Sequence, residues 1–245
     1  MKTSHELRSI NAVNHSDSGL HTALMSLVDY KGFRLVAYAL MPLDEYVRPR
    51  LMLFLFGQLI VLSQTTIVLD VLGEEPRIDE VALMKVNDVG SKLNLKEHGM
   101  ITHYDRRIRI SAASTVEVHR CPRTQEYYAL NLCDIYPSDH PAGKDFNLLD
   151  PLHRLRPEFV RHYKTSLSSD AFTSHAASRK EKEQCDNEVM YAAKYLREHT
   201  IPQFVRKLDE LEILPIDSKE FTERLHSHGI NVRHIGTSKF IRRIR

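Results

Sequence analysis

The stretch TALMSLVDYKGFRLVAYALMP, residues 22–42, decides the fold class. Its two runs are rich in apolar and β-prone residues, and Lys31-Gly32 between them is suited to a tight turn. Pro42 ends the second run, because proline has no N–H to donate to a strand ladder. The stretch predicts a β-hairpin as the first structured unit.

A second hairpin is predicted further along the chain. RIRISAASTVEVHR (residues 107–120) and EYYALNLCDIY (residues 126–136) flank a short turn segment, and apolar residues alternate in both runs. Between the two hairpins, residues 65–73 are another strand candidate. The apolar run LMLFLFGQLIVL, residues 51–62, is shorter than the roughly 20 residues that a membrane-spanning helix needs. We therefore expect a buried element there and no transmembrane segment.

Helical periodicity appears in residues 78–95, where apolar residues recur at spacings of three and four and Asp79 is a suitable N-cap. Beyond the second hairpin the chain becomes helical, starting with Pro157 at a favoured first position. A helix over residues 178–200 is expected to break at Ile201-Pro202, where another begins. The last helix starts with a capping box over residues 217–220 and ends at Gly229.

The predicted fold class is α+β, with a β-hairpin-rich first part followed by a helical C-terminal part. We expect a flexible N-terminal segment at residues 1–18 and one domain over residues 19–245. Within that domain, residues 19–140 are predicted to be β-rich and residues 157–245 α-rich. The length of 245 residues, with 42% apolar residues, is sufficient for one well-formed core.

Bulk properties narrow the classes of function. A formal charge of +2 is nearly balanced, so any nucleic-acid surface has to come from local clustering. The three cysteines occur at no repeated spacing, which favours a reducing compartment. The N-terminus has no apolar segment typical of a secretory signal. We therefore expect a cytoplasmic protein.

Signatures of enzymes are absent from the sequence: we find no nucleotide-binding glycine loop, nucleophile elbow or zinc-protease motif. The 14 histidines show no spacing that matches a metal site, so we expect no cofactor and no metal. One alternative remains open. Asp134 and Asp139 follow the second hairpin, and in a kinase-like phosphotransferase or ATP-dependent ligase they would hold Mg²⁺ against ATP phosphates.

The C-terminal stretch from residue 224 is basic and contains no acidic residue. Such a block can neutralise phosphates, so it is the predicted RNA-binding segment of a nearly neutral protein. A solvated tail or cations at a helix C-terminus is the alternative interpretation. The candidate RNA-binding residues are Arg233, Lys239, Arg242, Arg243 and Arg245.

Three ordered blocks resemble the Clu domain of the clustered mitochondria protein family. The first, residues 19–42, resembles the family's hairpin of Val-Asp-Tyr, basic residue, glycine and aromatic residue. The second, residues 114–139, is similar to its hairpin with a tyrosine-centred strand. The third, residues 201–236, resembles its helix, turn and closing glycine signature. The signature residues of this resemblance are Asp29, Gly32, Gly229, Asn231, Arg233 and Gly236.

The resemblance implies a non-enzymatic module of proteins that bind mRNA for mitochondrial proteins and influence mitochondrial distribution and translation. The partners it implies are mRNA and ribosome-associated or other proteins, and it supplies no catalytic residues. A protein–protein scaffold, with residues 51–62 docking a partner, is a further alternative. The apolar run at residues 51–62 has no counterpart in the family pattern. The family's ubiquitin-like and tetratricopeptide regions are also missing, so we expect a short relative or a fragment.

Overall fold

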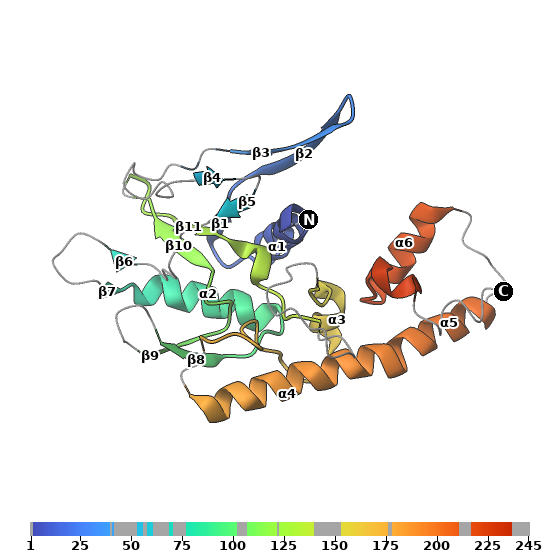
Figure 1. Ribbon diagram of the computed structural model, residues 1–245. Helices are drawn as coiled ribbons and strands as arrows, with labels where there is room; N and C mark the ends of the chain where they lie inside the picture. The colour runs from blue at the N-terminus through green and yellow to red at the C-terminus, as the bar shows by residue number, and fades with distance from the viewer. Residues whose placement is uncertain are drawn as a thin grey trace.

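The structure is a computed structural model (Figure 1), and it describes residues 2–39, 41, 53–55, 58–60, 69–70, 77–101, 107–121, 123–139, 153–175, 178–210 and 217–236. The first part of the chain contains all of the described strands and the C-terminal part is helical, so the predicted α+β class is confirmed.

The first predicted hairpin is confirmed. Strand β2 (Met25–Tyr30) pairs antiparallel with β3 (Phe33–Tyr38) in the register Tyr30↔Phe33. The turn residues Lys31 and Gly32 both have positive φ, 48° and 83°, as a two-residue hairpin turn of type I′ requires. The hairpin projects from one side of the molecule (Figure 1), and its residues are exposed on both faces except Met25, which is half-buried at its base.

The second hairpin is also confirmed, with different limits. Strand β10 (Glu117–Arg120) pairs antiparallel with β11 (Tyr127–Leu130). Strand β1 (Leu20–Thr22) joins β11 in parallel and completes a three-stranded sheet. The start of the predicted first run is a separate strand, β9 (Arg107–Ile110), which pairs with β8 (His98–Ile101). Residues alternate along β9: Ile108 and Ile110 are buried, whereas Arg107 and Arg109 are exposed. This alternation explains the pairing, because it gives β9 a buried face of its own.

Between residues 42 and 78 the described part of the chain consists of short strands. Strand β4 (Leu53–Leu55) pairs antiparallel with β5 (Gln58–Ile60), and β6 (Leu69–Asp70) with β7 (Arg77–Ile78). The prediction of a buried element at residues 51–62 concerns side chains that lie outside the described part of the chain.

The N-terminal segment differs from the prediction. Residues Lys2–Asn14 form helix α1, not a flexible segment. Ile10 and Val13 belong to the core, and the Glu6 carboxylate accepts a hydrogen bond of 3.1 Å from the Leu132 backbone N–H. The apolar residues are too few to give a strong helical pattern, so contacts with distant parts of the chain hold the helix.

Helix α2 (Glu80–Lys92) confirms the predicted amphipathic helix and its cap. The Asp79 side chain accepts hydrogen bonds from the N–H groups of Val81 and Ala82. The helix packs closely on the start of the segment after β9, since a Cβ added to Gly90 would lie 2.0 Å from the Ser111 carbonyl oxygen. The 3₁₀ turn η1 (Leu132–Asp134) follows the second hairpin, and helix α3 (Pro157–His162) begins at proline as predicted.

The predicted break at Ile201-Pro202 is wrong. Helix α4 (Arg179–Tyr195) continues through a π-helical segment, η2 (Leu196–Thr200), into α5 (Ile201–Glu210). The Ile201 N–H donates to the Leu196 carbonyl, five residues back, so the wider π turn accommodates Pro202 without ending the helix. The three segments form one long rod along the side opposite the β2–β3 hairpin (Figure 1).

Helix α6 (Ser218–Ser227) confirms both of its predicted ends. The Asp217 side chain accepts from the Glu220 N–H at 2.7 Å. After the helix, the Gly229 and Ile230 N–H groups donate to the carbonyls of His226 and Leu225, which is a Schellman motif with Gly229 at φ 72°. The 3₁₀ turn η3 (Val232–Gly236) follows. One continuous core extends from Ile10 to Ile230 and unites the strand-rich and helical parts.

Candidate functional site

An arginine cluster lies where distant parts of the chain meet. Helix α1 contributes His5 and Arg8, the segment before α3 contributes two arginines, and α6, η2 and η3 contribute the others. The cationic and histidine members are His5, Arg8, Arg154, Arg156, Arg197, His226, Arg233 and His234. We call this set the arginine cluster.

Asp139 is the most deeply buried carboxylate of the cluster, with 3% of its side chain exposed. Arg197 Nη1 lies 3.3 Å from one oxygen, and Arg233 and His234 Nε2 contact the other, His234 at 3.1 Å. Burial raises the pKa of Asp139, but the hydrogen bonds and charges of His234 and Arg233 outweigh burial and hold it below its usual value. Asp139 therefore anchors η3 and η2 to the end of the second hairpin.

The Asp134 carboxylate is also paired with an arginine. Arg154 Nη2 donates to its carboxylate at 2.6 Å, while Arg154 Nη1 donates to the Tyr136 carbonyl at 3.1 Å. The Asn231 amide donates in turn to the Arg154 carbonyl at 2.9 Å. Both carboxylates of the alternative magnesium site are thus bound by arginines. Within the described residues, no group of three or more His, Cys, Asp or Glu side chains could hold a metal ion.

Arg156 is buried, with 4% exposure, and holds Glu158 in a two-bond fork of 2.9 and 2.8 Å. Its third nitrogen, Nη1, is buried and has no hydrogen-bond partner among the described residues, and the same holds for Arg154 Nε. Burial, followed by the neighbouring arginine charges, lowers the pKa values of His5 and His226 to about 4. The cluster thus combines unsatisfied donors with two histidines, His5 and His226, that are neutral at pH 7.

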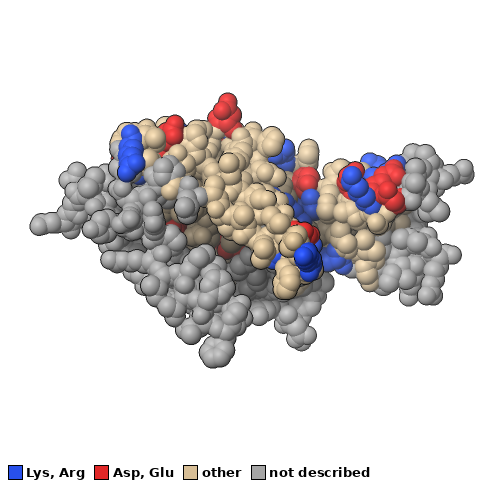
Figure 2. Space-filling view, turned by 90° about the horizontal axis from the view of Figure 1, so that it is seen from above, with Lys and Arg blue, Asp and Glu red and all other residues tan. Residues whose placement is uncertain are grey.

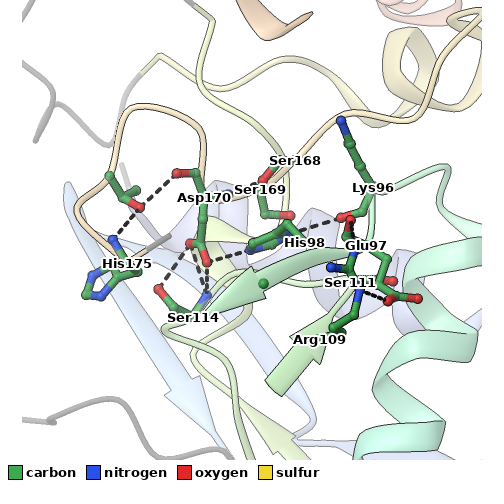
Figure 3. A network of polar contacts seen from close by, with 12 residues as sticks. Lys96, Glu97, His98, Arg109, Ser111, Ser114, Ser168, Ser169, Asp170 and His175 are labelled. Carbon is green, nitrogen blue, oxygen red and sulfur yellow. Dashed lines mark hydrogen bonds and ion pairs between the residues drawn. The ribbon is translucent and has the colours of Figure 1, made fainter. Parts of the chain in front are cut away.

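A second polar network is sealed in the core between β8 and the segment after α3 (Figure 3). His98 Nε2 lies 2.9 Å from the Asp170 carboxylate, which also accepts from the Ser114 backbone N–H and, at 3.0 Å, from its Oγ. Burial lowers the pKa of His98, but the hydrogen bond and charge of Asp170 outweigh burial and raise it above its usual value.

The residue types of this network are those of a serine-protease triad, but the connections are different. The Ser114 hydroxyl donates to Asp170, whereas nucleophilic catalysis requires a serine hydroxyl bonded to the histidine. All three side chains are also buried, His98 at 2% exposure. The network therefore stabilises the fold, with no route for a substrate to reach the hydroxyl.

The signature residues are spread over two distant sites. Asp29 pairs with Arg34 on the exposed hairpin at 2.7 Å, next to the turn at Gly32. Gly229, Asn231 and Arg233 belong to the end of α6 and the arginine cluster, and Gly236 closes η3. Of the candidate RNA-binding residues, Arg233 is paired with Asp139. The other four, Lys239, Arg242, Arg243 and Arg245, lie outside the described residues.

Sequence reasoning missed His5, Arg8, Arg154 and Arg156. Arg154 and Arg156 flank Leu155 just before Pro157, and this alternation of charged and buried residues is the only local signal of the site. The remaining members come together through tertiary contacts: Arg197 and Arg233 reach Asp139 from 58 and 94 positions away in the chain, and His5 of α1 lies near Arg154 and Arg233.

Comparison with known proteins gives two family matches. The model described as Clustered mitochondria matches residues 1–141, more than half of the chain. The model described as Translation initiation factor eIF3 subunit 135 matches residues 212–239, which include all of α6 and the cluster members His226, Arg233 and His234. No solved structure matches the chain.

Individual relatives match over short segments. A clustered mitochondria protein of Arabidopsis thaliana is 41% identical over 51 residues, which are 21% of this chain and 4% of that protein. A homologue from Lodderomyces elongisporus is 32% identical over 71 residues, 29% of this chain and 5% of the relative. Protein clueless of Drosophila persimilis is 48% identical over 48 residues, 20% and 3% of the two chains. The chain thus aligns with only a small fraction of each relative's length.

Proposed function

The chain belongs to the clustered mitochondria family, and on this premise we propose that it is a non-enzymatic binding module that associates with mRNA for mitochondrial proteins. In this proposal the module works in the cytoplasm, alongside the translation machinery, and influences the distribution of mitochondria. The match of residues 212–239 to a translation initiation factor subunit supports the link to translation. Of the described helices, none is long and apolar enough to cross a membrane.

The proposal depends most on the C-terminal segment, which is basic, contains no acidic residue and is held to the fold where it begins. From residue 224 onward the sequence has six Lys or Arg residues and no acid. Arg224 is paired with Glu220, and Arg233 with Asp139, so these two charges are neutralised within the fold. The remaining four, Lys239, Arg242, Arg243 and Arg245, are the proposed phosphate contacts, and Arg233 is the proposed anchor.

An electrophoretic shift assay at physiological salt tests RNA binding. We expect the double variant Arg242→Glu/Arg243→Glu to bind single-stranded RNA about tenfold more weakly, with a salt slope reduced by about two. The matched control is Arg206→Glu/Lys207→Glu, which reverses two adjacent exposed charges on α5 and should bind as the unmodified chain does. No measurable affinity of the unmodified chain would remove the RNA proposal.

The kinase-like alternative finds less support, because arginines occupy both of its metal-binding carboxylates. Displacing them would break these ion pairs, in which the Asp139 carboxylate is only 3% exposed. We expect the melting temperature to stay unchanged when millimolar Mg²⁺ and ATP are added. A saturable stabilisation by the nucleotide would restore the enzyme hypothesis.

A protein scaffold is a second candidate, favoured by the β2–β3 hairpin. Leu35, Phe33, Tyr30 and Tyr38 are all more than half exposed. The face of the molecule on this side has a broad area with few charged side chains, and charges of both signs gather toward the end that carries α6 (Figure 2). Exposed apolar side chains that gather on one element are typical of interaction sites.

Photo-crosslinking tests the scaffold in a cell extract. A photoreactive amino acid at position 33, at the hairpin turn, should give a discrete protein adduct. The same amino acid at the exposed position 180 on α4 is the matched control and should give none. Equal adducts at both positions, or no adduct at either, would contradict a specific docking function of the hairpin.

A further inference from the structure

A ladder of rings leads from the core to the surface where α3 lies beside the C-terminal end of α4 (Figure 1). Phe159 belongs to the core, and its ring centroid lies 5.3 Å from that of Tyr163. The centroid of Tyr163 lies 5.7 Å from that of Tyr195, edge to face, and the Tyr195 ring stacks on His199 at 4.9 Å. Because each ring packs on the next, the outer rings are held in place by the core.

The outer rings follow one exposed stripe along α4 and η2. Tyr191, Tyr195 and His199 occur at intervals of four residues, a spacing that places them on the same face of a helix. Tyr191 is 61% exposed and Tyr195 is 42% exposed. His199 belongs to the π-helical segment, and single π turns occur often at functional sites. We call Tyr191, Tyr195 and His199 the ring stripe.

Three cations lie next to these rings in the chain. Arg161 and Lys164 flank Tyr163, and Lys194 directly precedes Tyr195. All three cations are exposed, and within the part of the chain that the structure describes none of them forms an ion pair. Their charges are therefore available to a ligand from solvent.

Acidic residues are scarce around the three cations. Residues 159–169 contain none, and residues 189–208 contain only Glu198. Earlier on the same helix the situation is different, because Lys182 Nζ contacts the Asp186 carboxylate at 2.7 Å. Positive charge thus remains uncompensated beside the ring stripe, where it would attract a polyanion.

We propose that the ring stripe and these three cations bind single-stranded RNA. In this site bases stack on Tyr191 and Tyr195, and the cations hold the neighbouring phosphates. Exposed rings next to unpaired cations suit a single strand, because every unpaired base has a face that can stack and every nucleotide carries a phosphate. The inference rests on the proposed RNA-binding function, and it adds base contacts made by residues outside the C-terminal segment.

An electrophoretic shift assay of the full chain with a short single-stranded RNA tests the rings. We expect Tyr191→Ala/Tyr195→Ala to bind about tenfold or more weakly, because the stacked bases lose their partners. Tyr191→Phe/Tyr195→Phe keeps both rings and should bind normally. The matched control is Tyr30→Ala/Tyr38→Ala, which removes two similarly exposed rings from the β2–β3 hairpin. Equal affinity of Tyr191→Ala/Tyr195→Ala and the unmodified chain would overturn the proposal.

An abasic strand with the same number of phosphates tests stacking on the unmodified protein, so the result does not depend on whether a variant folds. The unmodified chain should bind this strand about tenfold more weakly than the RNA. Tyr191→Ala/Tyr195→Ala should bind it as well as the unmodified chain does, because no base is left to stack. If the unmodified chain bound both strands equally, the rings would contact no bases and the proposal would be wrong.

Salt dependence tests the cations. Lys164→Glu/Lys194→Glu should weaken RNA binding and reduce the salt slope by about two. Lys180→Glu/Lys219→Glu, at two exposed lysines of α4 and α6, is the control and should bind normally. Competition by an acidic peptide with RNA, with no effect of Tyr191→Ala/Tyr195→Ala on RNA binding, would assign the surface to an acidic protein partner and refute the RNA site.

The C-terminal contacts and the ring stripe fail in different ways. Arg242→Glu/Arg243→Glu should weaken binding and still prefer the RNA over the abasic strand, because the ring stripe is intact. If that variant lost affinity while Tyr191→Ala/Tyr195→Ala did not, the ring stripe alone would be wrong. Absence of any RNA affinity in the unmodified chain would remove both proposals.

Discussion

Gly229 and Gly32 both have positive φ, 72° and 83°, yet their surroundings are opposite. A Cβ on Gly229 would lie 2.5 Å from the Phe159 Cβ, whereas a Cβ on Gly32 would meet nothing within 4 Å. Gly32→Ala should therefore cost only backbone strain, about 1–2 kcal/mol. Gly229→Ala adds a clash with α3, for a total of about 2–4 kcal/mol. Urea unfolding of both variants measures the difference, and equal midpoints would mean that α3 moves aside freely.

The pKa of His98 gives the protein a defined pH dependence. The pKa is raised in the folded state above the ordinary value of about 6.5, because Asp170 stabilises the charged ring. The contribution of this ion pair is therefore complete below about pH 6.5 and is lost as the pH rises through the folded-state pKa. We expect the free energy of unfolding to fall as the pH rises above about 6.5, measured by urea titration at several pH values.

Asp170→Asn is the variant that isolates this effect. Its amide keeps the shape of the side chain but removes the charge that raises the His98 pKa, so the decline of stability with rising pH should disappear along with part of the stability. An NMR titration in which His98 of the unmodified protein changes charge at or below 6.5 would contradict the assignment.

At the scale of elements, the β2–β3 hairpin combines apolar sequence with exposure. Leu35 of β3 is 58% exposed, while Ile110 of β9 is fully buried, although both are apolar strand residues. Leu35→Ala should change the free energy of unfolding by no more than about 0.5 kcal/mol, and Ile110→Ala should lower it by about 2–5 kcal/mol. Thermal and urea melts of the two variants provide the measurement. A large loss in Leu35→Ala would show that the hairpin packs on other parts of the chain.

A comparison of local and long-range features shows what could be predicted from the sequence. The hairpin, the Asp79 cap and the Schellman end at Gly229 depend on residues within a few positions of each other, so their patterns are readable locally. The parallel pairing of β1 with β11 joins residues more than 100 positions apart and leaves no local pattern. The helix through Pro202 was missed because a π turn, set by packing around Leu196, replaces the expected break.

The arginine cluster was beyond prediction for the same physical reason. Asp134 and Asp139 were identified by their position after the hairpin, but their partners come from residues 154, 197 and 233. A sequence shows the acids and not the arginines that neutralise them, so a metal site and a structural ion-pair network looked alike. Only the fold distinguishes the two.

At the scale of the whole molecule, a single core extends from α1 to the end of α6, and this continuity has a measurable consequence. Leu225 of α6 is fully buried, and α6 is connected to α3 at Gly229 and to the end of the second hairpin through Arg233 and Asp139. Leu225→Ala should lower the free energy of unfolding by about 2–5 kcal/mol. Because the core is shared, we expect the loss of stability to extend to elements far from α6.

Hydrogen exchange under native conditions tests this coupling. In Leu225→Ala the slowest-exchanging amides of α2, β10 and β11 should lose protection by nearly the full loss of stability, because they open only when the whole core unfolds. Leu35→Ala, which leaves the core intact, is the control and should leave those amides unchanged. If protection fell only in α6 and η3, the C-terminal helices would form a separate cooperative unit. The arginine cluster would then be an interface between two units, held by the pairing of Arg233 with Asp139.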